Sequence, residues 1–348
     1  MLHVGLDLCR TRVDVSVLDP QGGRVLTTTA SPDPGGLASL AQRVSSLPGS
    51  GEVRAAIESM TGSRFVRDEL QGIGWEVLVA DAARVKGLAP LACKTDRIDA
   101  WVLAELSRRD LVPAIWLPPM GVRAERERAR WRMHLVKHRS MLKHRIHSTL
   151  MTFGVPTKVS DLFGVAGRQS LTQLGLPEPW ASDVTACLRL IDILDGEIHD
   201  CEHDLRRLGA DHRYIPRLMS APGIGWVLGY TIAAEVGDIT RFPTATKLVG
   251  YTGLCPYVHQ SGGKDHRGPV TKAGPKYLRW ALIEATSHAC KHPAYRARYQ
   301  RTKTRLGRQR GPSVARVELA RDLARAIWHM LTKNQDFAPA GAVNDLVA

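Results

Sequence analysis

Four acidic residues in the first hundred positions have the types and spacing needed to bind a divalent metal ion. Asp7 lies inside an apolar stretch, and Glu58 closes another, Ala55-Ala56-Ile57. Asp96 and Asp99 are three residues apart, which places both on one face of a helix. An acid at the end of an apolar strand is costly unless it is paired or binds metal. Four clustered carboxylates also repel one another without cations, so the set predicts bound Mg²⁺ or Mn²⁺.

Such a metal site indicates phosphodiester chemistry. Two ions about 3.5–4 Å apart stabilise both the attacking and the leaving oxygen of a displacement at phosphorus. Each acid taken singly has an ordinary explanation as a turn, a cap or a solvated helix face. The combination of all four, at strand ends and on one helix face, favours catalysis.

A second candidate is the segment Gln260-Ser261-Gly262-Gly263-Lys264. A hydroxyl followed by two glycines and a cation suits attack on a phosphate, because amides and Lys264 can hold the developing charge. The spacing is not that of a P-loop. From residue chemistry alone, Ser-Gly-Gly is more often a flexible turn.

The segment Ser220-Ala-Pro-Gly-Ile-Gly-Trp resembles a helix–hairpin–helix turn. Gly223 and Gly225 would leave backbone N–H groups open to grip a phosphate at a helix N-terminus. An ordinary connection between two helices is the alternative.

The charge indicates a polyanionic partner. The chain of 348 residues has a formal net charge of +14. Residues 123–145 hold nine Lys and Arg against two acids, and residues 264–310 hold thirteen against two. Phosphate contacts by such residues supply most non-specific nucleic-acid affinity. The expected contacts to nucleic acid are Arg130, Lys137, Lys143, Gly223, Gly225, Lys264, Arg267, Lys272, Lys276 and Arg279.

The elements that must position the four acids read as an α/β domain over residues 1–115. Strands are expected at 3–8, 13–19, 24–30, 53–59 and 75–81, with helices at 36–46, 63–72 and 95–107. Three strands followed by alternating helices and strands is the order of a ribonuclease-H-like, RuvC-like domain. In such a sheet the first and fourth strands are neighbours, so Asp7 and Glu58 can converge.

Residues 120–212 are expected to form a helical coiled-coil linker. Trp131, Leu135, Leu142 and Ile146 fall on one face of a first helix. A second helix has a near-heptad apolar seam from Val184 to Leu208. The two helices could form an intramolecular hairpin or a dimer interface, and we favour self-association, because one long apolar seam needs a partner.

Residues 213–335 are expected to form a small, mainly helical domain with the helix–hairpin–helix-like element, and 336–348 a flexible tail. The six cysteines are scattered without a CxxC pair, which argues against zinc and disulfides and for a reducing cytoplasm. No apolar run reaches the 18–20 or so residues of a membrane helix, and the N-terminus does not read as a signal peptide.

The segments GLDLCRTRVDVSV, AAIES, KTDRIDA, SAPGIG and YTGLCPYVHQSGGK…TKAGPKYLR together resemble the bridge-RNA-guided DEDD transposases of the insertion-sequence one-ten family. The resemblance extends from Val4 to about Met330. It departs at Arg10, where the family usually has Lys, and the charge is kept.

This resemblance implies a RuvC-like domain whose DEDD tetrad is Asp7, Glu58, Asp96 and Asp99, and a transposase domain whose catalytic serine is Ser261. It also implies Mg²⁺, donor and target DNA, a structured bridge RNA, and a dimer or tetramer with composite sites, in a prokaryotic, nucleoid-associated setting. Tyr257 is a weaker candidate for the nucleophile.

Two other functions stay open. A metal-dependent junction nuclease would use water as its nucleophile and would leave Ser261 a structural residue. A non-catalytic protein with a basic surface would bind nucleic acid and keep only a degenerate nuclease fold. The predicted function is a DNA recombinase that acts through a covalent serine–DNA intermediate.

Overall fold

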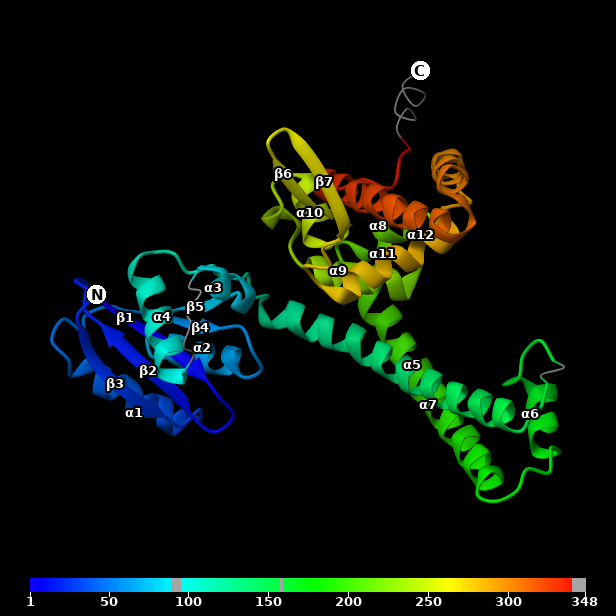
Figure 1. Ribbon diagram of the computed structural model, residues 1–348, viewed down its shortest axis with the longest axis horizontal. Helices are drawn as coiled ribbons and strands as arrows, with labels where there is room; N and C mark the ends of the chain where they lie inside the picture. Colours follow the sequence, from blue (N-terminus) through cyan, green and yellow to red (C-terminus); the bar gives the residue numbers. More distant parts are fainter. Residues whose placement is uncertain (89–94, 157–158, 340–348) are drawn as a thin grey trace. The chain divides into compact units, whose positions relative to one another are not determined.

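The computed structural model describes residues 1–88, 95–156 and 159–339. The chain divides into two compact units, Met1–Leu117 and Pro118–Ala348 (Figure 1). The expected linker, 120–212, and the expected C-terminal domain, 213–335, fall within the second unit.

The first unit is built on a five-stranded sheet with helices around it. Its elements are β1 (Leu2–Leu8), β2 (Val13–Leu18), β3 (Arg24–Ala30), α1 (Pro34–Ser45), β4 (Val53–Glu58), α2 (Ser63–Gly72), β5 (Glu76–Ala80), α3 (Ala82–Leu88) and α4 (Asp96–Arg108). The five strands and the helices α1, α2 and α4 were expected, with ends that differ by a few residues.

The strand order is β3-β2-β1-β4-β5. The first three strands are antiparallel neighbours, whereas β1, β4 and β5 run parallel. The central strand β1 is buried almost throughout, as expected of a strand covered on both faces. The predicted pairing of the first and fourth strands is confirmed, with Leu6 opposite Ile57.

Two helical layers cover the sheet. Leu37 and Leu40 of α1 and Val66 and Leu70 of α2 join one core with the strands. Leu103 of α4 belongs to a separate core that includes residues of β4 and β5. The helix α4 contacts β1, β2 and β4, and it begins with the Asp96 and Asp99 pair.

The second unit is mainly helical. Its elements are α5 (Met120–Thr152), α6 (Val165–Thr172), α7 (Trp180–Gly209), α8 (Ile215–Ser220), α9 (Trp226–Val236), the short 3₁₀ helix η1 (Ile239–Arg241), α10 (Ala245–Tyr251), β6 (Pro256–Ser261), β7 (Lys264–Val270), α11 (Lys276–Ala289) and α12 (Pro293–Lys333).

The long helices α5 and α7 form an intramolecular hairpin, with α6 near its far end (Figure 1). Val184, Leu188 and Ile191 of the α7 seam pack with Ile146 and Leu150 of α5. Ion pairs cross between the same two helices and join Arg132 to Glu202, Arg139 to Asp195 and Arg145 to Asp183. The preference for self-association through this seam is therefore corrected, because α5 of the same chain covers it.

The two-stranded antiparallel sheet of β6 and β7 was not expected from the sequence, which indicated a mainly helical domain. The signal was present in the Gly262-Gly263 pair, since two glycines between short polar-apolar runs favour a hairpin turn. Both glycines have positive φ, 55° and 78°, as that turn requires.

The helix α12 turns back on itself at Gly307, whose φ of 74° and ψ of −179° are not helical. The two arms are joined by a hydrogen bond from Thr302 to Glu318 and an ion pair between Arg298 and Asp322.

The chain after α12 is not free at residue 336, where the flexible tail was expected to begin. The Phe337 amide donates a hydrogen bond to the Ser220 hydroxyl, and its ring contacts His292 and Tyr295. The rest of the expected tail, 340–348, lies outside the described residues. No helix in the described parts of the chain is long and apolar enough to cross a membrane.

Candidate active site

The fold of the first unit brings the four predicted carboxylates to one edge of the sheet. Leu6 on β1 is paired with Ile57 on the neighbouring strand β4. Asp7 and Glu58 are the next residues of these two strands. Asp96 and Asp99 lie in the first turn of α4, where Thr95 caps the helix by accepting a hydrogen bond from the Ile98 amide.

Close packing of α4 on β1 brings the two pairs of acids together. A Cβ atom placed on Gly5 would lie 1.7 Å from the carbonyl oxygen of Ala100 and 2.5 Å from the amide nitrogen of Ala104. Only glycine permits this approach. Since Gly5 is two residues from Asp7 and Ala100 directly follows Asp99, the contact holds these acids near each other.

The electrostatics of Asp7 indicate that the four acids lie close together. The pKa of Asp7 is raised to about 6, first by burial and then by the negative charges of Asp99, Asp96, Glu58 and Asp14, in that order of importance. Both effects disfavour the ionised form. A half-buried carboxyl among like charges is the environment in which a bound cation is most stabilising.

The carboxylates are not drawn together around a single point. Among the described residues, no group of three or more His, Cys, Asp and Glu side chains is placed to hold a metal ion. Arg12 donates hydrogen bonds to Asp14 at 2.7 Å and to Asp96 at 2.9 Å. Glu58 and Asp99 also have partners.

The donor set nevertheless fits a divalent metal. All four groups offer carboxylate oxygens, which Mg²⁺ and Mn²⁺ prefer. The side chains of Arg12 and Asp96 are both about half-exposed, so solvent screens their ion pair. Breaking this ion pair therefore costs little free energy.

A cleft of about 620 Å³ begins at the residue after Glu58. The segment from Ser59 to Phe65, which includes the first residues of α2, lines it together with Val79, Ile115 and Leu117. Met60 and Phe65 are both exposed by more than a third. This cleft was not expected from the sequence, although two large apolar residues shortly after a candidate ligand were a signal.

The second unit contains Ser261, the other predicted catalytic residue. Ser261 is exposed at the end of β6, and its backbone pairs with that of Lys264 across the hairpin turn. A Cβ atom added to Gly262 or Gly263 would have no described atom within 4 Å. The segment is thus a hairpin tip that presents a hydroxyl on open backbone, and within this unit no described group crowds it.

The ten residues predicted to contact nucleic acid also lie in the second unit, in differing surroundings. Lys137, Arg267, Lys272 and Lys276 are exposed. The side chain of Lys264 lies outside the described residues. Lys143 is half-buried, with its amine 4.6 Å from the centre of the Phe163 ring.

Two of the predicted arginines have partners inside the chain. The Arg279 guanidinium donates to the carbonyl oxygens of Thr252 and Lys272, both at 3.2 Å, and so holds the end of the hairpin. Arg130 is bound to Glu235. Both arginines therefore have a structural role, and their contact with nucleic acid stays a prediction.

Gly223 also has a structural role. It adopts a φ of 80° in the turn between α8 and α9, and an added Cβ would lie 2.2 Å from the carbonyl oxygen of Ala285 on α11. Gly225 is the exposed N-cap of α9. A tight turn between two helices was expected here, whereas the close packing of that turn on α11 was not.

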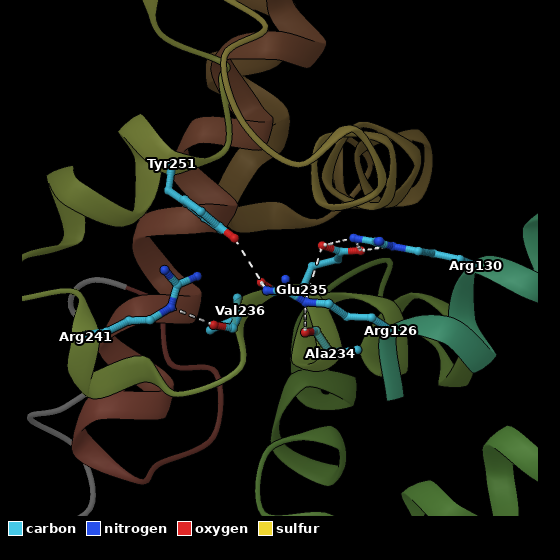
Figure 2. A network of polar contacts seen from close by, with 7 residues as sticks. All are labelled: Arg126, Arg130, Ala234, Glu235, Val236, Arg241 and Tyr251. Carbon is cyan, nitrogen blue, oxygen red and sulfur yellow. Dashed lines mark hydrogen bonds and ion pairs between the residues drawn. The ribbon is translucent and has the colours of Figure 1, made fainter. Parts of the chain in front are cut away.

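A buried charge network joins α5 to α9 (Figure 2). Glu235 is fully buried and accepts hydrogen bonds from Arg130 at 2.8 and 3.1 Å. Arg126 donates to the carbonyl oxygens of Ala234 and Glu235 at 2.8 and 2.7 Å. Removing one partner of such a buried pair typically costs about 3–5 kcal/mol. Glu235 was not singled out from the sequence, although an acid inside the apolar run Tyr230–Val236 was a signal.

The helix face expected to carry Trp131, Leu135, Leu142 and Ile146 is not buried along its whole length. Leu135 and Ile146 are buried, whereas 51% of the Trp131 surface is exposed. The chain instead buries Ala129 and Arg126 against the C-terminal core at this end of α5.

The first unit has carboxylates at the edge of its sheet and the second is helical and basic, and the comparison with known proteins identifies the class of protein. A model of DEDD transposases of the IS110 type matches residues 4–154. A model described as transposase IS116/IS110/IS902 family matches residues 215–300. The chain is therefore a DNA transposase, and it belongs to the IS110/IS116/IS902 family.

Relatives that match most of the length of this chain are also named as transposases. A probable family 20 transposase of Pseudomonas aeruginosa is 25% identical over 295 residues, which is 82% of this chain and 85% of the relative. The transposase for insertion sequence element IS1328 of Yersinia enterocolitica is 25% identical over 81% of this chain and 85% of the relative. The transposase for IS1111A of Coxiella burnetii is 27% identical over 70% and 68%.

Proposed function

We propose that this transposase cuts and rejoins DNA strands through a covalent bond between DNA and Ser261, with Asp7, Glu58, Asp96 and Asp99 as the metal site. The observation that supports this most is that the four acids lie near one edge of the sheet, on paired strands and with their charges raising the pKa of Asp7. The first unit has the strand order expected of a RuvC-like nuclease domain, which the proposal assigns to it.

In the proposed covalent step, one phosphodiester bond is exchanged for another. The Ser261 oxygen attacks phosphorus, the bond from phosphorus to one deoxyribose oxygen breaks, and that oxygen takes up a proton while the serine proton passes to water. A deoxyribose hydroxyl then attacks the serine phosphodiester and gives up its proton to water, and the bond from phosphorus to the Ser261 oxygen breaks as that oxygen takes up a proton. Strand joining therefore needs no external energy source.

The hairpin tip suits this role. Ser261 is exposed, and the two glycines after it allow a phosphate to approach the backbone closely.

The carboxylates would hold Mg²⁺ or Mn²⁺, which supplies stabilisation of the charge that develops on the phosphate oxygens. The residues themselves keep the ligands at one sheet edge. Asp7 and Glu58 come from adjacent strands, and Asp99 is held near them by the backbone contact at Gly5.

We propose that a structured bridge RNA selects the donor and target DNA sequences by pairing with them. This rests on the resemblance described above and on the basic segments at 123–145 and 264–310. A protein with such a guide needs mainly shape and phosphate contacts to the paired strands. We further propose a homo-oligomer, a dimer or tetramer, that works at the prokaryotic nucleoid.

The test is a search for a denaturant-resistant protein–DNA adduct. Full-length protein, guide RNA, Mg²⁺ and end-labelled donor DNA are mixed and run on a denaturing gel. We expect an adduct with the natural protein, its loss in Ser261→Ala, and its loss in Asp7→Asn. Tyr257→Phe is the matched control, because Tyr257 is the other exposed hydroxyl of this hairpin, and it should keep the adduct.

The outcomes separate the alternatives. Cleavage without an adduct in the natural protein would support the nuclease that uses water. An adduct that survives Ser261→Ala but not Tyr257→Phe would move the nucleophile to the tyrosine. Nucleic-acid binding with no metal-dependent cleavage would leave only the non-catalytic function.

A further inference from the structure

A cleft in the second unit contains neither the four acids nor Ser261, and it combines aromatic rings with basic side chains, among them the predicted nucleic-acid contacts Arg130 and Lys276. It has a volume of about 490 Å³, within the range of about 300–1,000 Å³ that ligand pockets have. It lies between the N-terminal half of α5 and the first turn of α11. Its lining residues are Glu127, Arg130, Trp131, His134, Lys276 and Tyr277.

Trp131 is the most unusual residue of this cleft. A half-exposed indole on a helix otherwise rich in charge leaves a large apolar surface in water. Two further exposed rings follow it on the same helix face, His134 three residues later and His138 seven residues later. The rings of His134 and His138 are 6.1 Å apart. The result is a row of rings along one side of α5.

Tyr277 lies on the other wall, and cations hold its ring. The Arg130 guanidinium is 5.0 Å from the ring centre, and the Lys276 amine is 4.9 Å from it. Arg130 is itself fixed by two hydrogen bonds to the buried Glu235, as Figure 2 shows. The ring is therefore pre-organised, so a ligand that stacks on it has little ordering cost to meet.

The charges of the cleft favour an anionic chain with flat apolar parts. Lys276 is exposed at the rim and available to a phosphate, while Arg130 adds a fixed positive charge behind Tyr277. Glu127 is the one acid in the lining, and it can accept hydrogen bonds from amino groups of bases. Rings beside cations are the combination that binds single-stranded nucleic acid, because each base has a face that stacks and each phosphate has a charge.

We propose that this cleft binds single-stranded nucleic acid, with an unpaired base against Trp131 and Tyr277 and a neighbouring phosphate at Lys276. A base inside a duplex cannot reach the rings, so the cleft selects unpaired strands. The inference deepens the proposed function, on which it rests, since strand exchange exposes unpaired segments. DNA and RNA share the chemistry invoked here, and the experiment tests each.

The test measures binding of full-length protein to labelled single-stranded DNA and RNA of mixed sequence and to the matching duplex by fluorescence anisotropy. Trp131→Ala and Tyr277→Ala are expected to weaken single-strand binding about 5- to 150-fold, the range that corresponds to loss of one base–aromatic stack. Trp131→Phe and Tyr277→Phe keep a ring and should retain most of the affinity. Binding of duplex should change less than about twofold in every variant.

Met141→Ala is the matched control, because Met141 is a large apolar residue of α5 that is 55% exposed but does not line the cleft. It should leave single-strand binding unchanged. Circular dichroism of each variant checks that the fold is kept, and Trp131 is exposed enough for its removal to be tolerated. As a second measurement, a bromouridine-bearing strand should become crosslinked to Trp131 or Tyr277 on irradiation.

Three results would overturn the proposal. One is unchanged single-strand binding in both alanine variants. Another is an equal loss of duplex binding, which would make the cleft a general phosphate surface. The third is a change of oligomeric state in Trp131→Ala with binding intact, which would make the row of rings a contact between copies. Ser261→Ala should keep single-strand binding, so failure of the serine mechanism and failure of this proposal are distinguishable.

Discussion

At the scale of single residues, the carboxylate site is held at a cost to the folded protein. Asp7 is half-buried beside three other acids of the site, and both its burial and their charges disfavour its ionised form. Active sites commonly retain such unfavourable groups because function needs them. The metal-free protein should therefore be less stable than one in which Asp7 is neutral.

We predict that Asp7→Asn stabilises the metal-free protein above pH 6. The pKa of Asp7 is about 6 in the folded protein against 3.8 for an ordinary aspartate, so the folded state binds more protons between these values. Stability then falls as the pH rises from about 4 to about 6, and the asparagine variant should lack this fall. After allowance for solvent screening, the gain above pH 6 should be about 1–2 kcal/mol.

Urea unfolding in the presence of a chelator at pH 4, 5, 7 and 8 measures this effect. Asp200→Asn is the control, since Asp200 is exposed on α7 and far along the chain from the acids of the site. It should leave the pH profile unchanged. Profiles of the same shape for Asp7→Asn and the natural protein would contradict the prediction.

At the scale of elements, the contact between β1 and α4 determines where the proposed metal ligands lie. The backbones of the strand and the helix touch at Gly5, so no side chain can be inserted there without moving α4. Two of the proposed ligands lie on β1 and β4, and two lie on α4. A shift of α4 would therefore separate the two halves of the site while leaving every ligand present.

We predict that Gly5→Ala destabilises the protein by about 1–3 kcal/mol, the usual cost of overpacking. It should also lower metal-dependent cleavage by more than the loss of folded protein accounts for. Gly72→Ala is the matched control in the same unit, because Gly72 lies at the end of α2 with open space around it. That change should be neutral or stabilise by up to about 1 kcal/mol. Urea unfolding and a cleavage assay measure both variants, and unaltered cleavage in Gly5→Ala would show that α4 can shift without loss of the site.

At the scale of the whole molecule, the proposed nucleophile and the proposed metal ligands belong to different compact units. The carboxylates lie in Met1–Leu117 and Ser261 lies in Pro118–Ala348. A working site that needs both groups can therefore be assembled from two protomers.

We predict that a mixture of Asp7→Asn and Ser261→Ala proteins forms the adduct, although each variant alone does not. If the sites are shared between protomers of a dimer, half of the randomly mixed dimers contain both variants, and one of their two sites has all its groups. The mixture should then recover about a quarter of the natural adduct, as the two-fold symmetry of such a dimer requires. Labelled DNA on a denaturing gel measures it. If the mixture gives no adduct while the natural protein does, each site is built from one protomer.

The sequence by itself determined the local features of this protein. Apolar runs and turn residues predicted the five strands of the first unit, and the cost of burying an acid in an apolar strand pointed to Asp7 and Glu58. These features depend on residue type and on periodicity within a few positions, which are visible along the chain.

The tertiary structure decided which surfaces have partners. The α7 seam is covered by α5, Trp131 is exposed at a cleft, and Arg130 is bound to Glu235 more than a hundred residues away. Periodicity shows that a face is apolar but not what covers it, and composition shows a charge but not its counterion. Both depend on contacts between segments distant in the sequence, and only the folded chain brings those segments together.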